Sequence, residues 1–205
     1  MKILEQLDQN SEEWFDRRLG KITGSKLHGI IVKRGNKKKI GFYELMAERI
    51  AIKEAWEDPM ERGSRLEEEA LKSFEKKTGK KVDQVGFCIS DKYPDIALSP
   101  DGLIKNGEKY DEAVEVKCLS SARHLQAYFE KEIPNDYDEQ AIQYFIVNED
   151  LETLHFTFYD PRITALQVHV IEVKRKDVEE KIEAYREYQV KSLEEIDTML
   201  EELTF

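Results

Sequence analysis

Three charged residues in the middle of the chain, Asp101, Glu115 and Lys117, have the types and spacing for metal-assisted chemistry. Glu115 and Lys117 lie two positions apart, so a strand would point both side chains to the same face. The intervening Asn106-Gly107 pair is typical of a tight hairpin, which would bring Asp101 alongside them. Carboxylates suit Mg²⁺ or Mn²⁺, and two such ions can position a water and stabilise charge at a phosphorus. Lys117 would orient or help to deprotonate that water.

A fourth charged residue, Glu67, is expected to reach the same place from a helix. The spacing of apolar residues predicts a helix over about 62–77 that ends at Gly79. Glu67 precedes three members of its apolar stripe by three, four and seven positions, so it projects beside that stripe. A carboxylate driven toward a core is costly unless something satisfies it, and a metal ion is one such partner. The stripe consists of Leu66, Ala70, Leu71 and Phe74.

The elements that must hold these residues indicate a mixed α/β fold with a central sheet. Alternation of apolar and polar residues predicts strands, helical spacing predicts helices, and the order of both favours one domain over residues 1–205. The expected helices are one with Ser11 as N-cap ending at Gly20, a short one opened by Ser25, and those over 42–56, 120–130, 136–147 and 177–203. The expected strands cover 85–89, 96–104, 112–118, 153–159 and 166–173.

The composition excludes several protein classes. Of 205 residues, 40% are hydrophobic and 37% charged, with five prolines and ten glycines, which rules out collagen and a wholly disordered chain. No apolar run approaches the ~18 residues of a membrane span. Glu5 and Asp8 lie where a signal peptide needs its apolar region, so we expect a cytoplasmic protein. Neither Cys88 nor Cys118 belongs to a C-x-x-C pair, which argues against a zinc ribbon.

The charge is unevenly distributed along the chain. The net charge of −11 argues against a generic nucleic-acid binder, yet residues 1–40 hold ten Lys or Arg against five Asp or Glu. Residues 176–205 hold four against ten, on a predicted helix with near-heptad apolar spacing. The basic stretch is either a phosphate-contacting segment or a solvated loop. The last helix either packs between subunits, receives a partner protein, or covers its own domain.

A series of short motifs, in order along the chain, resembles a known family. Pro100-Asp101 with Glu115-Val116-Lys117 is similar to the core of the PD-(D/E)XK nuclease superfamily. The full series more narrowly resembles the bacteriophage lambda exonuclease, or YqaJ-like viral recombinase, family. Its other members are Trp14, Arg18-Leu19-Gly20, Ile22-Thr23-Gly24-Ser25, Gly63-x-x-x-Glu67, Ser99-Pro100-Asp101-Gly102-Leu103, Tyr137-x-x-Gln140-x-x-Gln143-Tyr144 and Tyr159-Asp160-Pro161-Arg162.

The resemblance implies a restriction-endonuclease-like fold and a role for each matching residue. Asp101, Glu115 and the Val116 carbonyl match the principal metal ligands, and Glu67 matches a carboxylate near a second ion. Lys117 matches the catalytic lysine. Gln140 matches the residue that helps to place the water or phosphate. Arg18, Ser25 and Thr23 match a pocket that grips a 5′-terminal phosphate. Met60 is either a wedge between base pairs or a core residue.

The activity implied by the resemblance is degradation of one strand of duplex DNA from its 5′ end. Mononucleotides would be released and a 3′ overhang left for recombination, with two Mg²⁺ ions per site that Mn²⁺ can replace. The resemblance also implies a homotrimeric ring around the DNA and a single-strand annealing protein as partner. A ring would let an acidic protein hold a polyanion in a locally positive channel.

Three alternatives stay open from the residues alone. An endonuclease of the same superfamily shares Glu67, Asp101, Glu115 and Lys117 but does not need the Arg18 pocket. A non-catalytic module that binds DNA ends or protein has no reason to keep those four costly polar groups together. An acidic helical adaptor fits the C-terminal thirty residues and leaves the hairpin unexplained.

Overall fold

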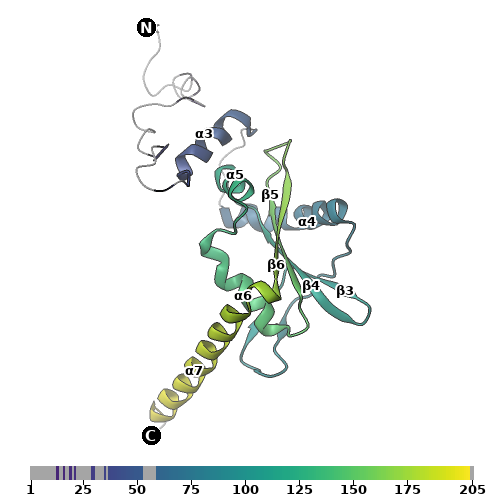
Figure 1. The fold of residues 1–205 in the computed structure, drawn as a ribbon, viewed down its shortest axis with the longest axis vertical. Helices are drawn as coiled ribbons and strands as arrows, with labels where there is room; N and C mark the ends of the chain where they lie inside the picture. Colours follow the sequence, from purple (N-terminus) through teal and green to yellow (C-terminus); the bar gives the residue numbers. More distant parts are fainter. Residues whose placement is uncertain are drawn as a thin grey trace.

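A four-stranded mixed sheet with helices on both faces forms the body of the protein (Figure 1). The strand order is β3-β4-β5-β6, and a separate pair, β1 and β2, forms a two-stranded sheet. The structure, a computed structural model, describes residues 37–52 and 59–203 and seven earlier positions, without the side chains of residues 59, 60, 64, 197, 200, 202 and 203. Those earlier positions are Glu13, Asp16, Leu19, Lys21, Gly29, Ile30 and Gly35. Most residues of the helices predicted from Ser11 and Ser25 therefore lie outside the described residues, and both helices stay predictions.

The hairpin predicted at Asn106-Gly107 is confirmed. β3 (Gly102–Asn106) pairs with β4 (Lys109–Lys117) in antiparallel fashion, with Gly102 opposite Val114. Gly107 adopts a φ of 64°, a left-handed conformation that glycine enters without a Cβ penalty. If this register is extended by one residue, Asp101 lies opposite Glu115. The hairpin therefore brings the two carboxylates together.

The strand predicted over residues 96–104 is wrong as a single element. β2 (Ala97–Leu98) pairs with β1 (Cys88–Ile89), and the chain then breaks before β3 begins at Gly102. Pro100 has no N–H for a ladder. The Asp101 side chain instead accepts a hydrogen bond from the Val116 N–H of β4 at 2.7 Å. The strand predicted over 85–89 is correspondingly short.

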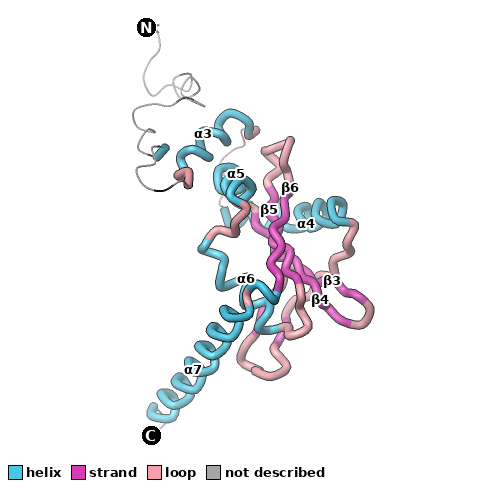
Figure 2. The backbone as a smooth tube through the Cα atoms, viewed as in Figure 1, coloured by secondary structure: helices cyan, strands magenta, loops and turns pink. Residues whose placement is uncertain are grey.

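The two central strands are parallel and buried. β4 pairs in parallel with β5 (Thr153–Tyr159), which pairs in antiparallel fashion with β6 (Val168–Lys174). A parallel pair needs a crossover connection. This one consists of α5 (Ser121–Glu130), the short η1 (Asn135–Tyr137) and α6 (Asp138–Val147), as Figure 2 shows.

Side-chain alternation along β4 and β5 separates two hydrophobic cores. Val114 and Val116 face α4 (Pro59–Thr78) and contact its apolar stripe. Phe156 and Phe158, with Ala113, face the other way onto α6. Glu115 lies between Val114 and Val116 and therefore points to the α6 side of the sheet.

Two helices depart from the sequence prediction. α3 (Ile40–Ile50) was expected over 42–56, but Ala51 is already extended and the Ile52 N–H donates to the Arg162 carbonyl at 2.9 Å. That bond to a distant loop ends the helix. α4 begins three residues earlier than predicted, at Pro59, a residue that suits the first helical position. It ends before Gly79, whose φ is 72°.

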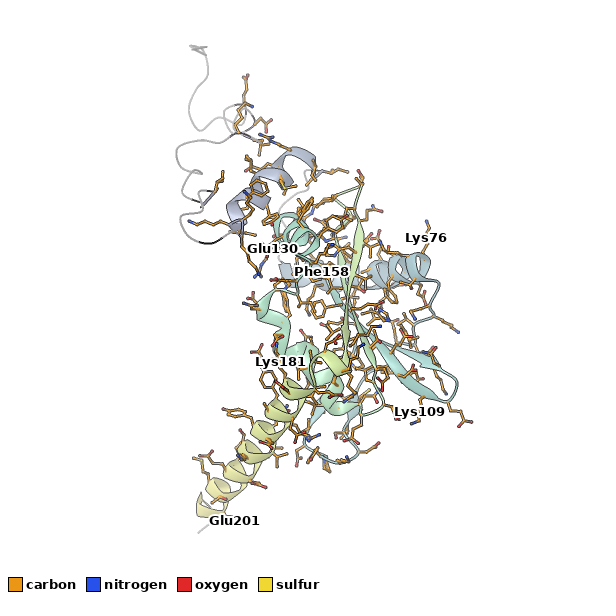
Figure 3. All side chains as sticks on the ribbon, viewed as in Figure 1. Lys76, Lys109, Glu130, Phe158, Lys181 and Glu201 are labelled. Atoms are coloured by element: carbon orange, nitrogen blue, oxygen red, sulfur yellow. The ribbon has the colours of Figure 1, made fainter. Side chains whose placement is uncertain are left out.

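The last helix, α7 (Glu179–Leu203), leaves the body of the protein (Figure 3). Ile182 near its start is buried in the core against α6, whereas Ile196 and Met199 are exposed. Glu201 lies far from the sheet in which Phe158 is buried, as Figure 3 shows. The distal half of α7 therefore makes little contact with the sheet.

Gly102, next to Asp101, tests how closely the segment after α4 packs against β3. A Cβ at this position would lie 2.2 Å from Val82 Cγ1, so we expect Gly102→Ala to destabilise the fold by about 1–3 kcal/mol. Urea denaturation measures this cost. In a Val82→Ala background, which removes the clashing methyl group, the same substitution should cost less. An equal cost in both backgrounds would show that the contact is not the cause.

Candidate active site

The five residues predicted to be catalytic line one cleft. Glu67 comes from α4, Asp101 from the turn before β3, Glu115 and Lys117 from the end of β4, and Gln140 from the first turn of α6. The cleft has a volume of about 670 Å³. Its other lining residues are Gly63, Val116, Cys118, Leu119, Ser120, Arg123 and Tyr137.

Asp101 is held in this cleft by two hydrogen bonds, one to its side chain and one from its backbone. Its carboxylate accepts from the Val116 N–H, and its own N–H donates to the Tyr144 hydroxyl at 3.2 Å. Burial raises the pKa of Asp101 above its usual range, and the Val116 bond and the charge of Lys117 oppose that rise only in part. The carboxyl group is therefore fixed in position, and the positive charge near it does not fully offset the cost of burying its negative charge.

Glu115 and Lys117 form an ion pair on one face of β4, as their spacing predicts. Glu115 is 1% exposed, and the side chain of Lys117, which contacts it through Nζ, is 18% exposed. The ammonium group also lies 5.0 Å from the centre of the Tyr137 ring. Burial and the nearby charge of Asp101 raise the pKa of Glu115, and Lys117 and Tyr144 lower it to a smaller extent.

Tyr144 joins the two buried carboxylate residues and was not assigned a role from the sequence. Its hydroxyl donates to Glu115 Oε2 at 2.5 Å while accepting from the Asp101 N–H. Burial and the adjacent Glu115 raise the pKa of Tyr144, so the hydroxyl stays a donor at neutral pH. The spacing of Gln140 and Tyr144 places both on one face of α6, and this spacing was the available indication in the sequence.

Glu67 approaches the cleft from α4, beside the apolar stripe as predicted. Burial raises the pKa of Glu67, the charge of Asp101 raises it further, and Lys117 opposes both. Three carboxyl groups thus share one partly dehydrated cleft that contains one lysine near them. A divalent cation would relieve the excess negative charge of such a set.

The donor set suits a hard divalent cation. Oxygen ligands are those that Mg²⁺ and Mn²⁺ prefer, and Asp101, Glu115 and Val116 provide two carboxylates and a carbonyl. Among the residues that the structure describes, no three His, Cys, Asp or Glu side chains are arranged to hold a metal together. Asp101 and Glu115 are instead occupied by the Val116 N–H and by Lys117 and Tyr144.

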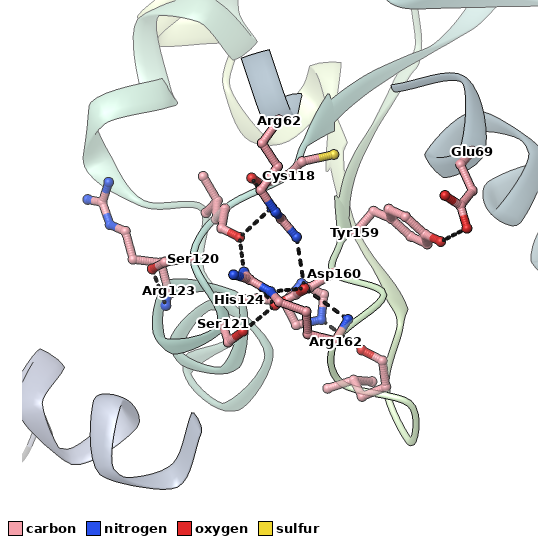
Figure 4. Close-up of polar contacts among 12 residues, drawn as sticks. Arg62, Glu69, Cys118, Ser120, Ser121, Arg123, His124, Tyr159, Asp160 and Arg162 are labelled. Carbon is pink, nitrogen blue, oxygen red and sulfur yellow. Dashed lines mark hydrogen bonds and ion pairs between the residues drawn. The ribbon is translucent and has the colours of Figure 1, made fainter. Parts of the chain in front are cut away.

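A buried charge network fixes the end of β4 directly beyond Lys117 (Figure 4). Arg62, on α4 next to the cleft residue Gly63, donates to the Cys118 carbonyl at 3.0 Å and to the fully buried Asp160 at 3.0 Å. It therefore ties the helix of Glu67 to the strand of Glu115 and Lys117. Asp160 was noted in the sequence as part of a motif, but Arg62 was not noted.

Asp160 is the centre of this network. Arg162 donates to both of its carboxylate oxygens, at 2.8 and 3.0 Å, and the Ser121 hydroxyl donates at 2.5 Å from the start of α5 (Figure 4). Burial favours a higher pKa, but the bonds from Arg162 and Ser121 outweigh it and hold the pKa of Asp160 below its usual range. Asp160 thus remains a carboxylate that joins α4, β5 and α5.

The residues predicted to bind a 5′-phosphate, Arg18, Thr23 and Ser25, lie outside the described residues. Met60 lies in α4, but its side chain is likewise outside the described part of the chain. Their roles stay predictions.

Comparison with known proteins identifies the family. The YqaJ-like viral recombinase domain matches residues 13–150, which include all five residues predicted to be catalytic, from Glu67 to Gln140. The chain belongs to this family. A search of curated protein sequences gave no match.

Solved structures confirm the fold of this YqaJ-like chain. An alkaline exonuclease (LHK-Exo) from Laribacter hongkongensis is 24% identical, with a TM-score of 0.55 over 93% of this chain and 100% of that chain. A structure of LHK-Exo in complex with dAMP gives the same values. The predicted mixed α/β fold of the PD-(D/E)XK type is thus confirmed. None of the described helices is long and apolar enough to cross a membrane.

The network around Asp160 predicts an order of stability losses. Asp160→Asn removes the charge that the buried Arg62 and the half-buried Arg162 share, and we expect it to cost about 3–5 kcal/mol. Arg62→Met should cost less, about 1–3 kcal/mol, because Arg162 still compensates Asp160. Urea denaturation at neutral pH measures both. Since the pKa of Asp160 is lowered, its stabilisation should persist above its ordinary value of 3.8 and fade as the pH falls below it. A reversed order would contradict the central role of Asp160.

Proposed function

We propose that this chain is a Mg²⁺-dependent nuclease that degrades one strand of linear double-stranded DNA from its 5′ end. Mononucleotides would leave and a 3′ single-stranded overhang would remain for recombination by strand annealing. The observation that carries the proposal is the convergence of Asp101, Glu115 and Lys117, with Glu67 and Gln140, on one cleft. Membership of the YqaJ-like viral recombinase family and the likeness to an alkaline exonuclease support it.

Each cleft residue has a role that its chemistry allows. Asp101, Glu115 and the Val116 carbonyl would hold one divalent ion, and Glu67 a second. When bound, such ions activate water and stabilise charge on the phosphate oxygens. Lys117 would orient the attacking water and neutralise developing charge once Glu115 has another partner. Gln140, in the first turn of α6, would place the water or the phosphate through its amide.

The position of bond cleavage follows from the proposed end pocket. Water attacks the phosphorus between the first and second nucleotides, and the bond to the 3′ oxygen of the first breaks. The phosphate then stays on the new 5′ end, so Arg18, Ser25 and Thr23 can grip it again in the next cycle. The released product is a deoxynucleoside monophosphate, the class of compound named in the LHK-Exo complex with dAMP.

The family resemblance extends the proposal to assembly. A homotrimeric ring would enclose the duplex and let this acidic chain stay on it, and Met60 would be placed to separate base pairs. A single-strand annealing protein would take up the overhang. A solution mass that corresponds to a monomer at micromolar concentration would count against the ring.

The catalytic assignment predicts that Asp101→Asn abolishes digestion of linear duplex DNA while the protein stays folded. We expect Lys117→Met to lower the rate by about 10²-fold or more, because a charge that acts in the transition state is removed. Release of labelled mononucleotides with Mg²⁺, and its loss on chelation, measures both effects. Lys109→Met is the matched control, since Lys109 lies at the other end of β4 and pairs with Asp150 on the surface.

The substrate in this assay separates the proposed function from the alternatives. A circular duplex should stay intact, whereas cleavage of the circle would favour an endonuclease. Absence of cleavage with any divalent metal would favour a non-catalytic module that binds DNA ends. Robust Mg²⁺-dependent digestion by the Asp101→Asn variant would overturn the assignment of the site.

The end pocket makes a separate prediction. Arg18→Ala should slow digestion from 5′-phosphorylated ends by about tenfold or more, since a charge-assisted bond is lost, and should hardly affect 5′-hydroxyl ends. Initial rates on the two substrates measure the difference. An equal loss on both ends would remove Arg18 from the pocket.

A further inference from the structure

The cleft is lined by a cationic side chain, that of Arg123, to which none of the roles above is assigned. Among its described lining residues, Lys117 and Arg123 carry cationic side chains. Lys117 is largely buried and contacts Glu115. Arg123 contacts Asp136 at 2.6 Å, and the two side chains are 38% and 58% exposed. The partner of Arg123 is therefore at the surface, where water or a ligand can replace it.

Arg123 differs in this respect from Arg62 and Arg162, which also lie near the end of β4. Arg62 and Arg162 both donate to Asp160, which is fully buried (Figure 4). Releasing either guanidinium from a buried carboxylate would carry a large desolvation cost. An exposed ion pair is worth only about 0.2–1 kcal/mol, so Arg123 can change partners readily.

The backbone of Arg123 is fixed even though its guanidinium is exchangeable. Its N–H donates to the Ser120 hydroxyl, the N-cap of α5, and both residues line the cleft. Asp136 lies in η1, next to the cleft residue Tyr137. The side chain of Arg123 thus starts from a fixed point in the cleft wall and is held by an acidic residue at its edge.

The negative charge of the cleft indicates why a cationic side chain is useful at this position. Glu67, Asp101 and Glu115 line the same space, so a DNA strand brings further negative charge to a site already rich in it. Metal ions between the acids would compensate the scissile phosphate. The neighbouring phosphates need other cations, and the planar fork of arginine matches a phosphate bidentately.

We propose that Arg123 binds an internucleotide phosphate next to the scissile one, and that Asp136 competes with this phosphate for the guanidinium. The inference rests on the proposed nuclease function and adds a substrate contact to it. In the free protein Asp136 holds Arg123, and on binding DNA the phosphate replaces Asp136.

This exchange predicts opposite effects for the two partners of one ion pair. Arg123→Gln should weaken DNA binding by about tenfold or more and raise KM, because a charge-assisted phosphate contact is lost. Asp136→Asn should strengthen binding by up to about fivefold, because the competing pair is removed. Arg123→Lys, which keeps the charge without the fork, should fall between wild type and Arg123→Gln.

The measurements are anisotropy of a labelled duplex in chelator and KM for Mg²⁺-dependent digestion, each at several salt concentrations. Arg123→Gln should also lower the slope of log affinity against log salt by about one. The matched controls are Lys181→Gln and Asp138→Asn. These residues form another exposed ion pair, 50% and 37% exposed, whose members do not line the cleft. Both controls should change binding little.

The outcomes separate this inference from the proposed function. If the wild-type protein digests DNA but Arg123→Gln behaves like Lys181→Gln, the phosphate contact is wrong and the nuclease stands. If Arg123→Gln and Asp136→Asn weaken binding equally, the pair merely ties α5 to η1, and the exchange is wrong. If the wild-type protein neither binds nor digests DNA, both proposals fail.

Discussion

The bond from the Val116 N–H to the Asp101 carboxylate is the contact on which the candidate site depends. If the β3–β4 register continued, residue 100 would lie opposite Val116, but Pro100 has left the ladder. The Asp101 side chain takes the place of a backbone acceptor. The point at which β3 begins and the position of the carboxylate are thus set by one hydrogen bond, and any shift of the hairpin register would break it.

This placement has an electrostatic cost that shapes the surroundings. Glu115 is buried and Asp101 is partly buried, and burial raises the pKa of both carboxyl groups. The charge of Asp101 raises the pKa of Glu115 further. Tyr144 stabilises the pair by donating to Glu115 and accepting from the Asp101 N–H. Lys117 supplies the opposite charge. The fold therefore keeps two acidic side chains together without fully compensating their negative charge. A divalent cation would supply the missing positive charge.

Local sequence patterns were enough to predict the hairpin and the face that Glu115 and Lys117 share. Asn106-Gly107 specifies a turn, and alternation along a strand specifies which side chains point together. The five residues predicted to be catalytic were found from these patterns and from the family resemblance. β5 was predicted over its full length because its composition is strand-like, and all seven of its residues are buried in the structure.

Contacts between distant segments were not predictable in this way. The end of α3 depends on a bond from Ile52 to the Arg162 carbonyl, which no property of residues 42–56 indicates. The bond from the Val116 N–H to the Asp101 side chain, which accompanies the break at Pro100 in the strand predicted over 96–104, joins residues 15 positions apart. The joining of Arg62 to Asp160 spans 98 positions. Each of these contacts requires the tertiary arrangement before it can be recognised.

The arginines around the end of β4 form two kinds of ion pair. The buried pairs fix the geometry, whereas the exposed pair can change partner. Arg62 and Arg162 meet a buried carboxylate, and the cost of separating them makes the geometry beyond Lys117 rigid. Arg123 meets an exposed carboxylate a short distance along the chain, where separation costs little. A site that must hold its acids still and yet admit and release a polyanion needs both kinds of pair. The rigid pairs fix where the reacting groups lie, and the exposed pair is the one that a passing phosphate can replace.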